Sequence, residues 1–247
     1  MPDIHHIVSR QVRRWMQDRE IQERARQEHQ EALRPCEIKP VVTVSRQRGS
    51  RGHELAKLLA HELNYGLFDH KIVNFIADHI GARSELVESL DERDRSELEL
   101  WVKGMLSGNI FSHDHYIHAL IEVLKTVSLQ GSVVIVGRGA NSILAGTNAF
   151  HLRVVAPEKV RIRNLVELEG MTEALAAADI KRVDRERADF FKRYFHKDIN
   201  DPTQYDMVIN TANTPLDAAV KTVLSALRAR GWTMELTGGD KRAKVLT

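Results

Sequence analysis

Short apolar runs and longer amphipathic segments alternate along the chain. The runs that predict strands are residues 41–44, 67–69, 133–136, 151–155 and 207–209. Segments with apolar residues three or four positions apart predict helices at about 55–63, 70–80, 84–106 and 116–129. This alternation indicates an α/β fold in three layers, a five-stranded parallel sheet with helices on both faces. Ligands bind such sheets outside the carboxyl ends of the strands.

Residues 41–56 predict a buried strand, a turn rich in Gly, Ser and Arg, and the first turn of a helix. The helix carries an apolar face made of Leu55, Leu58, Leu59 and Leu63. We expect it to end at residues 64–66, where Gly66 suits a left-handed cap.

The turn in this segment has the composition of an anion site. Free backbone N–H groups and the positive end of a helix dipole converge after such a strand. The turn carries three arginines and no acid, which points to phosphate. The predicted phosphate-binding residues are Arg46, Arg48, Gly49, Ser50, Arg51, Gly52 and His53.

The turn departs from a standard P-loop. With Gly52 as the second glycine of G-x-x-x-x-G-K-[ST], Gln47 takes the place of the first glycine. His53 stands at the lysine position and Glu54 at the Ser/Thr position. An ordinary strand–helix turn with surface arginines is therefore an equal alternative on the loop alone.

Further motifs favour the phosphate interpretation. The loop resembles the S-R-x-x-G-S-x-G-x-E-[IL]-A opening of the cytidylate kinase-like family, relatives of bacterial cytidylate kinase. Five more segments resemble that family in the same order, namely residues 68–70, 133–140, 156–163, 184–188 and 205–211. The resemblance covers roughly residues 40–230. The order and spacing of the motifs, rather than any single one, make it specific.

The resemblance implies a P-loop kinase fold and ATP- and Mg²⁺-dependent phosphoryl transfer to a nucleoside monophosphate, CMP or dCMP. It implies that Asp69, Gly137 and Arg138 hold the acceptor. Arg138, with Arg161, Arg185 and Arg187 of the arm and lid, would then serve catalysis. Cytidylate kinases have G-R-D where this chain has Gly137, Arg138 and Gly139, which leaves the base preference open.

Structural roles compete with these assignments. Asp69 suits the N-cap of the next helix, and both roles are compatible. Arg138 would otherwise cap a helix through a salt bridge. The lid arginines would otherwise belong to a solvated helix with pairs such as Asp189 and Arg193.

Candidate metal ligands are few. Ser50 is the predicted ligand of Mg²⁺, with Ser45 as a substitute and Glu54 as a poorer one. His113, His115 and His118 fit no standard zinc spacing, so a polar loop entering a helix is the favoured explanation.

We divide the chain into an N-terminal helical extension and linker (1–39), a kinase-like core (40–232) and a flexible tail (233–247). Within the core, an acceptor-binding helical region covers about 70–130 and a lid about 170–203. The extension carries an apolar stripe at helical spacing formed by Ile4, Val8, Val12, Trp15 and Met16. Docking on the protein's own core is favoured for this stripe over a partner or homo-oligomer contact.

Charge and cysteine content limit the classes of partner and the compartment that we expect. The formal net charge is only +2, so no global field favours nucleic acid or a membrane. The one cysteine, Cys36, excludes an internal disulfide framework and fits a reducing compartment, so we expect a cytoplasmic protein.

Two functions remain for these motifs. One is a nucleoside monophosphate kinase, favoured by Arg138 and the lid arginines. The other is a catalytically impaired nucleotide-binding module that acts by regulation or partner contact, favoured by His53 at the lysine position.

Overall fold

The computed structural model describes residues 15–17, 40–90, 92–106 and 115–232. The predicted linker, the tail, His113 and the apolar stripe other than Trp15 and Met16 lie outside these ranges.

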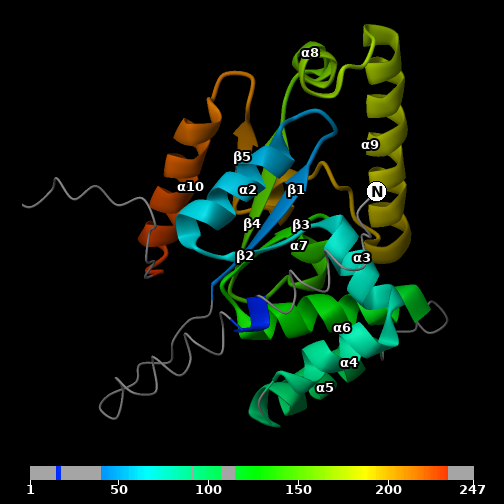
Figure 1. The fold of residues 1–247 in the computed structure, drawn as a ribbon, viewed down its shortest axis with the longest axis vertical. Helices are drawn as coiled ribbons and strands as arrows, with labels where there is room; N and C mark the ends of the chain where they lie inside the picture. The colour runs from blue at the N-terminus through cyan, green and yellow to red at the C-terminus, as the bar shows by residue number, and fades with distance from the viewer. Residues whose placement is uncertain (1–14, 18–39, 91, 107–114, 233–247) are drawn as a thin grey trace, which may run out of the picture. The chain divides into compact units, whose positions relative to one another are not determined.

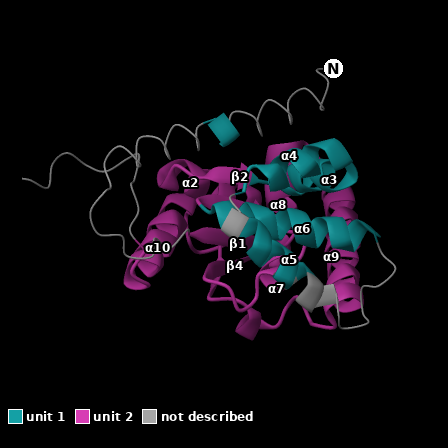
Figure 2. Ribbon diagram, turned by 90° about the horizontal axis from the view of Figure 1, so that it is seen from below, with its two compact units in different colours: residues 1–39, 68–131 teal, residues 40–67, 132–247 magenta. Residues whose placement is uncertain are grey.

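The chain divides into two compact units, coloured in Figure 2. Unit 1 combines residues 1–39 and 68–131, and unit 2 combines residues 40–67 and 132–247.

A five-stranded sheet in the order β2-β3-β1-β4-β5 confirms the predicted architecture (Figure 1). β1 pairs in parallel with β3 and β4, and β4 pairs in parallel with β5. The strands are β1 (Val41–Arg46), β2 (Gly66–Phe68), β3 (Val133–Val136), β4 (Ala149–Val155) and β5 (Met207–Asn210). Every predicted strand is present, with bounds that differ from the prediction by at most two residues.

The register brings the ends of three strands to one edge. Val44 of β1 lies opposite Val136 of β3, and Arg46 lies opposite Val154 of β4. Because these strands are parallel, the residues that follow each of them meet at the same carboxyl edge.

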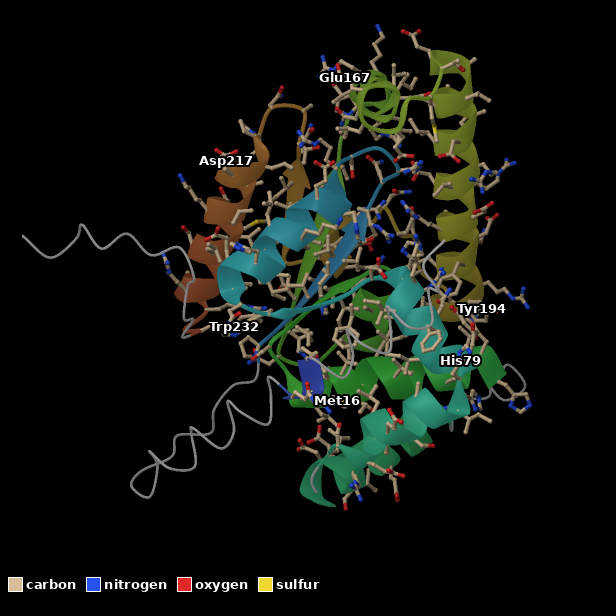
Figure 3. The ribbon with its side chains drawn as sticks, in the orientation of Figure 1. Met16, His79, Glu167, Tyr194, Asp217 and Trp232 are labelled. Atoms are coloured by element: carbon tan, nitrogen blue, oxygen red, sulfur yellow. The ribbon has the colours of Figure 1, made fainter. Side chains whose placement is uncertain are left out.

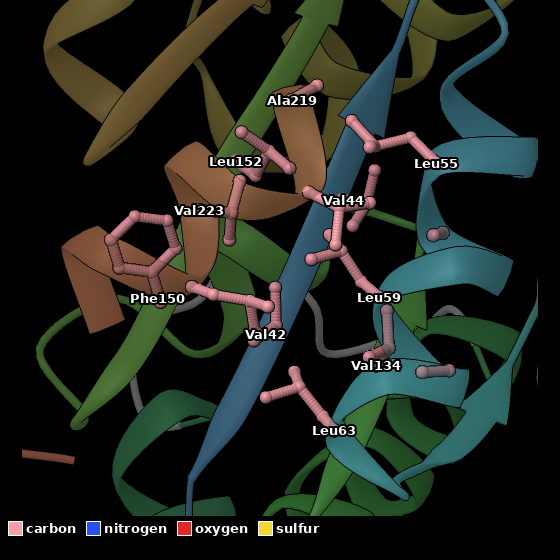
Figure 4. Close-up of a cluster of buried hydrophobic side chains, with 14 of the residues drawn as sticks. Val42, Val44, Leu55, Leu59, Leu63, Val134, Phe150, Leu152, Ala219 and Val223 are labelled. Carbon is pink, nitrogen blue, oxygen red and sulfur yellow. The ribbon is translucent and has the colours of Figure 1, made fainter. Parts of the chain in front are cut away.

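One face of the sheet is apolar. Val42 and Val44 alternate along β1 and pack with α2 (Gly52–Leu63) and α10 (Leu216–Ala229), as Figure 4 shows. The ring of Trp232, labelled in Figure 3, meets Phe150 edge-on at 6.5 Å between centroids. Burying a large side chain of this kind stabilises the fold by about 1.5–3 kcal/mol.

Two details of α2 differ from prediction. Leu58 is 41% exposed, because the buried arc of the helix runs through Leu55, Leu59 and Leu63 and excludes it. The left-handed cap is Asn64 rather than Gly66, with φ of 53°, and Gly66 instead begins β2.

On the opposite face, Thr43 and Ser45 of β1 and His151 and Arg153 of β4 carry polar groups. Thr43 Oγ1 hydrogen-bonds with His151 Nδ1 at 2.8 Å, and the His151 N–H donates to Asp206 Oδ2 at 2.7 Å. Burial lowers the pKa of His151 below its ordinary value of 6.5, although Asp206 opposes that shift. The histidine therefore resists protonation in the folded protein.

We expect this histidine to make folding sensitive to acid. A depressed folded-state pKa gives stability that is present above about pH 6.5 and is lost as the pH falls through the folded-state pKa. His151→Asn keeps an acceptor for Thr43 but cannot be protonated. Urea unfolding at about pH 8 and about pH 5.5 should show a smaller loss of free energy on acidification in the variant than in the parent. An equal loss in both proteins would rule out His151 as the source.

Unit 1 consists mainly of helices α3 (His70–Asp78), α4 (Ile80–Glu88), α5 (Glu92–Leu106) and α6 (His115–Gln130). Trp15 meets Phe68 edge-on at 5.0 Å between ring centroids. The single helix predicted over 84–106 is wrong, because the chain turns after Glu88. Leu86 and Leu90 are both buried at helical spacing across the turn, so the pattern hid the break.

The remaining elements of unit 2 follow the sheet. They are α7 (Ala140–Ile143), α8 (Glu158–Glu169), α9 (Glu173–Phe195) and the 3₁₀ turn η1 (Pro202–Gln204). α8 and α9 form a helical hairpin with its own small apolar core of Leu165, Ala176 and Ile180. Gly170 ends α8 in a left-handed conformation, and the Thr172 hydroxyl caps α9. α9 lies within the range predicted as a lid, about 170–203, and closure of this segment stays a prediction.

Candidate functional site

Arginines gather at the carboxyl edge of the sheet in unit 2. Arg46 ends β1, Gly137 and Arg138 follow β3, and Arg187 comes from α9. A Cβ on Gly137 would collide with Nη1 of Arg46, so the Arg46 guanidinium lies against the turn after β3. Arg187 Nη1 donates to the Arg46 carbonyl oxygen at 2.9 Å. The fold thus brings together residues predicted from three separate motifs.

The backbone after β3 is in an uncommon conformation. Gly137, Arg138 and Gly139 have φ of 82°, 53° and 67°. Positive φ suits the two glycines but costs a non-glycine residue about 1–2 kcal/mol. Such strained residues cluster at ligand sites, and the role of Arg138 in holding the acceptor stays a prediction.

Several positive charges act on Arg187 in this cluster. Burial lowers the pKa of Arg187, and the positive charges of Arg48, Arg153 and Arg138 lower it further, while Asp184 opposes them. These like charges lie close enough to repel one another, so an anion among them would be stabilised.

Both glycines of the β1–α2 loop allow close contacts. Gly49 has φ of 78°, and a Cβ there would lie 2.7 Å from the Arg161 carbonyl oxygen. A Cβ on Gly52 would lie 2.5 Å from Cβ of Arg46 and 3.1 Å from Cβ of Val154. The glycines therefore let the loop pass between α8 and the end of β1.

Arg48 binds the α8–α9 hairpin. Its Nη1 and Nη2 donate to the Glu169 carboxylate at 2.7 and 2.5 Å, and its Nε donates to Asp179 at 2.7 Å. The hydrogen bond with Glu169 is the main cause that raises the pKa of Arg48, and Arg48 in turn lowers the pKa of Asp179. The three acid contacts occupy the face of Arg48 that a phosphate would need.

Asp184 binds the loop backbone. Its carboxylate accepts from the Arg48 backbone N–H at 2.9 Å and from Arg161 Nη1 at 2.5 Å, and lies 3.8 Å from Arg187 Nη1. Asn164 Nδ2 adds a hydrogen bond to the Gly49 carbonyl oxygen at 2.9 Å. A carboxylate thus already sits where a loop N–H and two arginines converge.

Several predicted residues point elsewhere. Arg51 pairs with Glu54 of its own helix at 2.7 Å on the surface, and Arg185 is exposed on α9. Ser50 is fully buried, with its hydroxyl donating to the Gln47 carbonyl oxygen at 2.9 Å. His53 is half-buried in the first turn of α2.

Asp69 belongs to unit 1, where it caps α3. Its Oδ1 accepts from the backbone N–H groups of Lys71 and Ile72 at 2.9 and 3.1 Å. The capping role named as an alternative is present, and contact with the acceptor stays a prediction.

Sequence reasoning missed a buried polar group beneath the arginine cluster. Arg153 of β4 is 4% exposed and donates through Nη1 to Ser45 Oγ at 2.7 Å. Tyr205 completes the group, with its hydroxyl 3.4 Å from Ser45 Oγ. A charged residue inside a predicted buried strand was the available signal.

Gly139 lies against an aromatic ring. A Cβ on Gly139 would collide with Phe195, which belongs to an aromatic group with Phe190 and Phe191 at the end of α9. A ring from α9 therefore lies against the third position of the G-R-x motif, and a side chain such as Asp would require Phe195 to shift. Figure 3 labels Tyr194 in the same region.

A matched pair of substitutions tests this contact. Gly139 and Gly170 have nearly the same backbone, with φ of 67° and 68°, but Gly170 has nothing within 4 Å of an added Cβ. Gly139→Ala should therefore destabilise the protein by about 1–3 kcal/mol more than Gly170→Ala, measured by urea unfolding. Equal losses would show that the ring moves aside without cost.

The described part of the chain holds no group of three or more His, Cys, Asp or Glu side chains suited to a metal. The hydroxyl of Ser50, the predicted Mg²⁺ ligand, faces inward to the Gln47 carbonyl oxygen, and magnesium binding by Ser50 stays a prediction. Within the same residues, no helix is long and apolar enough to span a membrane.

The chain is similar to a known protein family. The sequence profile of the Cytidylate kinase-like family matches residues 41–213, which include β1 through β5. That match covers more than half of the chain.

Individual relatives agree with the profile. A cytidylate kinase of Halobacterium salinarum is 25% identical over 191 residues, covering 76% of this chain and 90% of the relative. One from Natronomonas pharaonis is 23% identical over 190 residues, with the same coverage. Among solved structures, an uncharacterized protein from Eubacterium ventriosum is similar, with a TM-score of 0.62, 23% identity, and coverage of 78% of this chain and 99% of that one.

Proposed function

Because the chain belongs to the cytidylate kinase-like family, we propose that it transfers the γ-phosphoryl group of ATP to a nucleoside monophosphate, CMP or dCMP. The observation that carries the proposal is the arginine cluster at the carboxyl edge of the sheet, where Arg46, Arg138 and Arg187 converge. Phosphoryl transfer depends mainly on positioning and on neutralising developing charge, and such a cluster suits both tasks.

We assign separate tasks to the loop and to the turn after β3. The β1–α2 loop from Arg46 to His53 precedes a helix N-terminus and would hold the donor phosphates. Arg138 would hold the acceptor phosphate through its planar guanidinium, which can bind two oxygens at once. Mg²⁺ bound to the nucleotide would neutralise part of the phosphate charge.

Arg187 and Arg161 would act on the transferring group. Both reach the loop from the α8–α9 hairpin, Arg187 through the Arg46 carbonyl oxygen and Arg161 through Asp184 and the Arg48 carbonyl oxygen. Positive charge held in this way needs no rearrangement when the transferred group becomes more negative. Standard P-loops have a lysine at the position of His53, and these arginines would supply part of the positive charge that such a lysine provides.

A second candidate function has its own support. Arg48 is bound by Glu169 and Asp179, and His53 replaces the usual lysine, so a nucleotide-binding module without turnover is the alternative. Such a module would bind nucleotide at the same edge and act through a partner.

One assay separates the two functions. ADP formation from ATP and Mg²⁺ is measured with CMP, dCMP, UMP, AMP or GMP as acceptor and with no acceptor. The kinase proposal expects ADP formation that depends on the monophosphate, with CMP or dCMP preferred. Nucleotide binding without acceptor-dependent ADP would instead support the regulatory module.

A further inference from the structure

Arg153 is a buried cation whose contacts are all neutral. Besides its bond to Ser45, its Nη2 donates to Asn200 Oδ1 at 3.0 Å, and its guanidinium carbon lies 5.7 Å from the centroid of the Tyr205 ring. Asp184 and Asp198 act on it only as more distant charges. Within the described part of the chain, Arg153 therefore has no carboxylate to balance its charge.

This arrangement works against folding. A buried charge without a paired opposite charge loses its hydration and gains little in return. Burial accordingly lowers the pKa of Arg153, and it is the largest influence on that group. A neutral side chain of similar size in this position would avoid the cost. A role other than stability is the remaining reason for the charge.

The position of Arg153 suggests that role. In the sheet register it lies opposite Ser45, the residue immediately before Arg46 and the loop. Its charge is one of those that lower the pKa of Arg187, so its field reaches the arginine cluster. Arg153 is only 4% exposed, so its positive charge would act on a ligand at a distance, without hydrogen bonds from its own N–H groups to that ligand.

We propose that Arg153 is a positioning residue that supplies fixed positive charge beneath the arginine cluster and so strengthens the binding of di- and triphosphate groups. It also holds Ser45 Oγ, and with it the end of β1 from which the loop departs. The choice of phosphate as the anion rests on the proposed function. The buried charge and its reach to Arg187 do not depend on it.

The competing explanation is a packing role. Arg153 joins β4 to Asn200 and lies near the ring of Tyr205, so it could simply hold the segment before β5. Substitutions at Arg153 separate the two roles. Arg153→Lys keeps the positive charge, whereas Arg153→Gln keeps N–H donors and loses the charge.

The test uses the full chain and inorganic pyrophosphate as the probe. Calorimetric titration gives the affinity of the parent, Arg153→Gln and Arg153→Lys, and urea unfolding gives their stability. Arg153→Gln should bind pyrophosphate at least roughly tenfold more weakly, as expected for loss of a nearby unit charge at the effective dielectric of a protein. Its free energy of unfolding should equal or exceed that of the parent. Arg153→Lys should stay within about threefold of the parent affinity, because it keeps the charge.

Asn200→Ala provides the matched control. It removes a hydrogen bond from Arg153 but leaves the charge, so stability should fall while pyrophosphate affinity stays within about threefold of the parent. Parent-like affinity in Arg153→Gln, equal loss of affinity in the Lys and Gln variants, or failure of Arg153→Gln to fold would each overturn the proposal. A parent protein that does not bind pyrophosphate would overturn it as well.

This titration needs no phosphoryl transfer. If the parent binds pyrophosphate and Arg153→Gln weakens that binding, but the parent phosphorylates no nucleoside monophosphate, the proposed kinase activity fails and the role of Arg153 stands. If turnover is normal and Arg153→Gln binds pyrophosphate as the parent does, the kinase stands and the role of Arg153 fails.

Discussion

Replacing Arg187 with alanine should lower kcat for phosphoryl transfer by about 10³-fold, the lower end of the effect of an arginine on a transferring phosphoryl group. The side chain is 27% exposed, so a ligand can reach it, and its Nη1 is held by the Arg46 carbonyl oxygen. Repulsion from Arg48, Arg153 and Arg138 means that an anion gains more from this guanidinium than from an isolated one. Steady-state kinetics with saturating ATP and acceptor measures the effect.

Arg185 is the matched control for Arg187. It lies two positions earlier on α9 and is exposed, and two residues along a helix are about 200° apart. Arg185→Ala should therefore change kcat by less than about threefold, within the small effect usual for an exposed charge. Comparable losses in the two variants would show that the hairpin acts through its overall charge rather than through Arg187.

Arg138→Ala should raise the KM for the acceptor, lower kcat, or both, while ATP binding is largely retained. Arg138 follows β3, whereas the proposed donor loop follows β1, so the substitution removes a contact to only one of the two substrates. Arg138 is half-buried, and loss of a guanidinium from a phosphate costs about 2–5 kcal/mol when the bound pair is shielded from water. Acceptor kinetics and calorimetry with ATP alone separate the two effects.

Backbone strain at Arg138 requires its own control. Because φ is 53°, alanine keeps the strain that glycine would relieve. If the guanidinium matters, Arg138→Gly should be as impaired as Arg138→Ala, and Arg138→Lys should recover only part of the activity because a point charge cannot bind two oxygens in the same way. Recovery in Arg138→Gly would place the effect in the backbone instead.

Much of the fold could be predicted from local pattern. Apolar β-branched runs such as residues 133–136 mark buried parallel strands, because both faces of such strands are covered. Because neighbouring parallel strands end at the same edge of a sheet, Arg46 and Gly137 meet there. The break after Glu88 could not be predicted, because buried leucines keep helical spacing across it.

The partners of individual arginines could not be predicted in the same way. Arg48 and Arg51 lie in one turn, yet Arg48 pairs with Glu169 of α8, far away in sequence, while Arg51 pairs with its neighbour Glu54. Only the folded hairpin decides which acid lies within reach. Loop composition therefore predicts a basic turn but not which acid each of its arginines binds.

Arg153 shows another limit of pattern reasoning. The residues on either side of Arg153 in the strand are apolar, and those apolar residues alone predict the strand. Alternation along β4 places Arg153 on the same face as His151, away from the apolar core. A parallel strand buried on both faces does not reveal from sequence which face holds a polar network.

The most direct test of the account follows the phosphoryl group itself. The parent protein is incubated with Mg²⁺, CMP and ATP labelled at the γ-phosphate, and the labelled products are separated. Label should appear in CDP, and Arg138→Ala and Arg187→Ala should form labelled CDP more slowly than the parent, while Arg185→Ala should form it at close to the parent rate. Label found only in ATP, or only in inorganic phosphate, would contradict phosphoryl transfer at the arginine cluster.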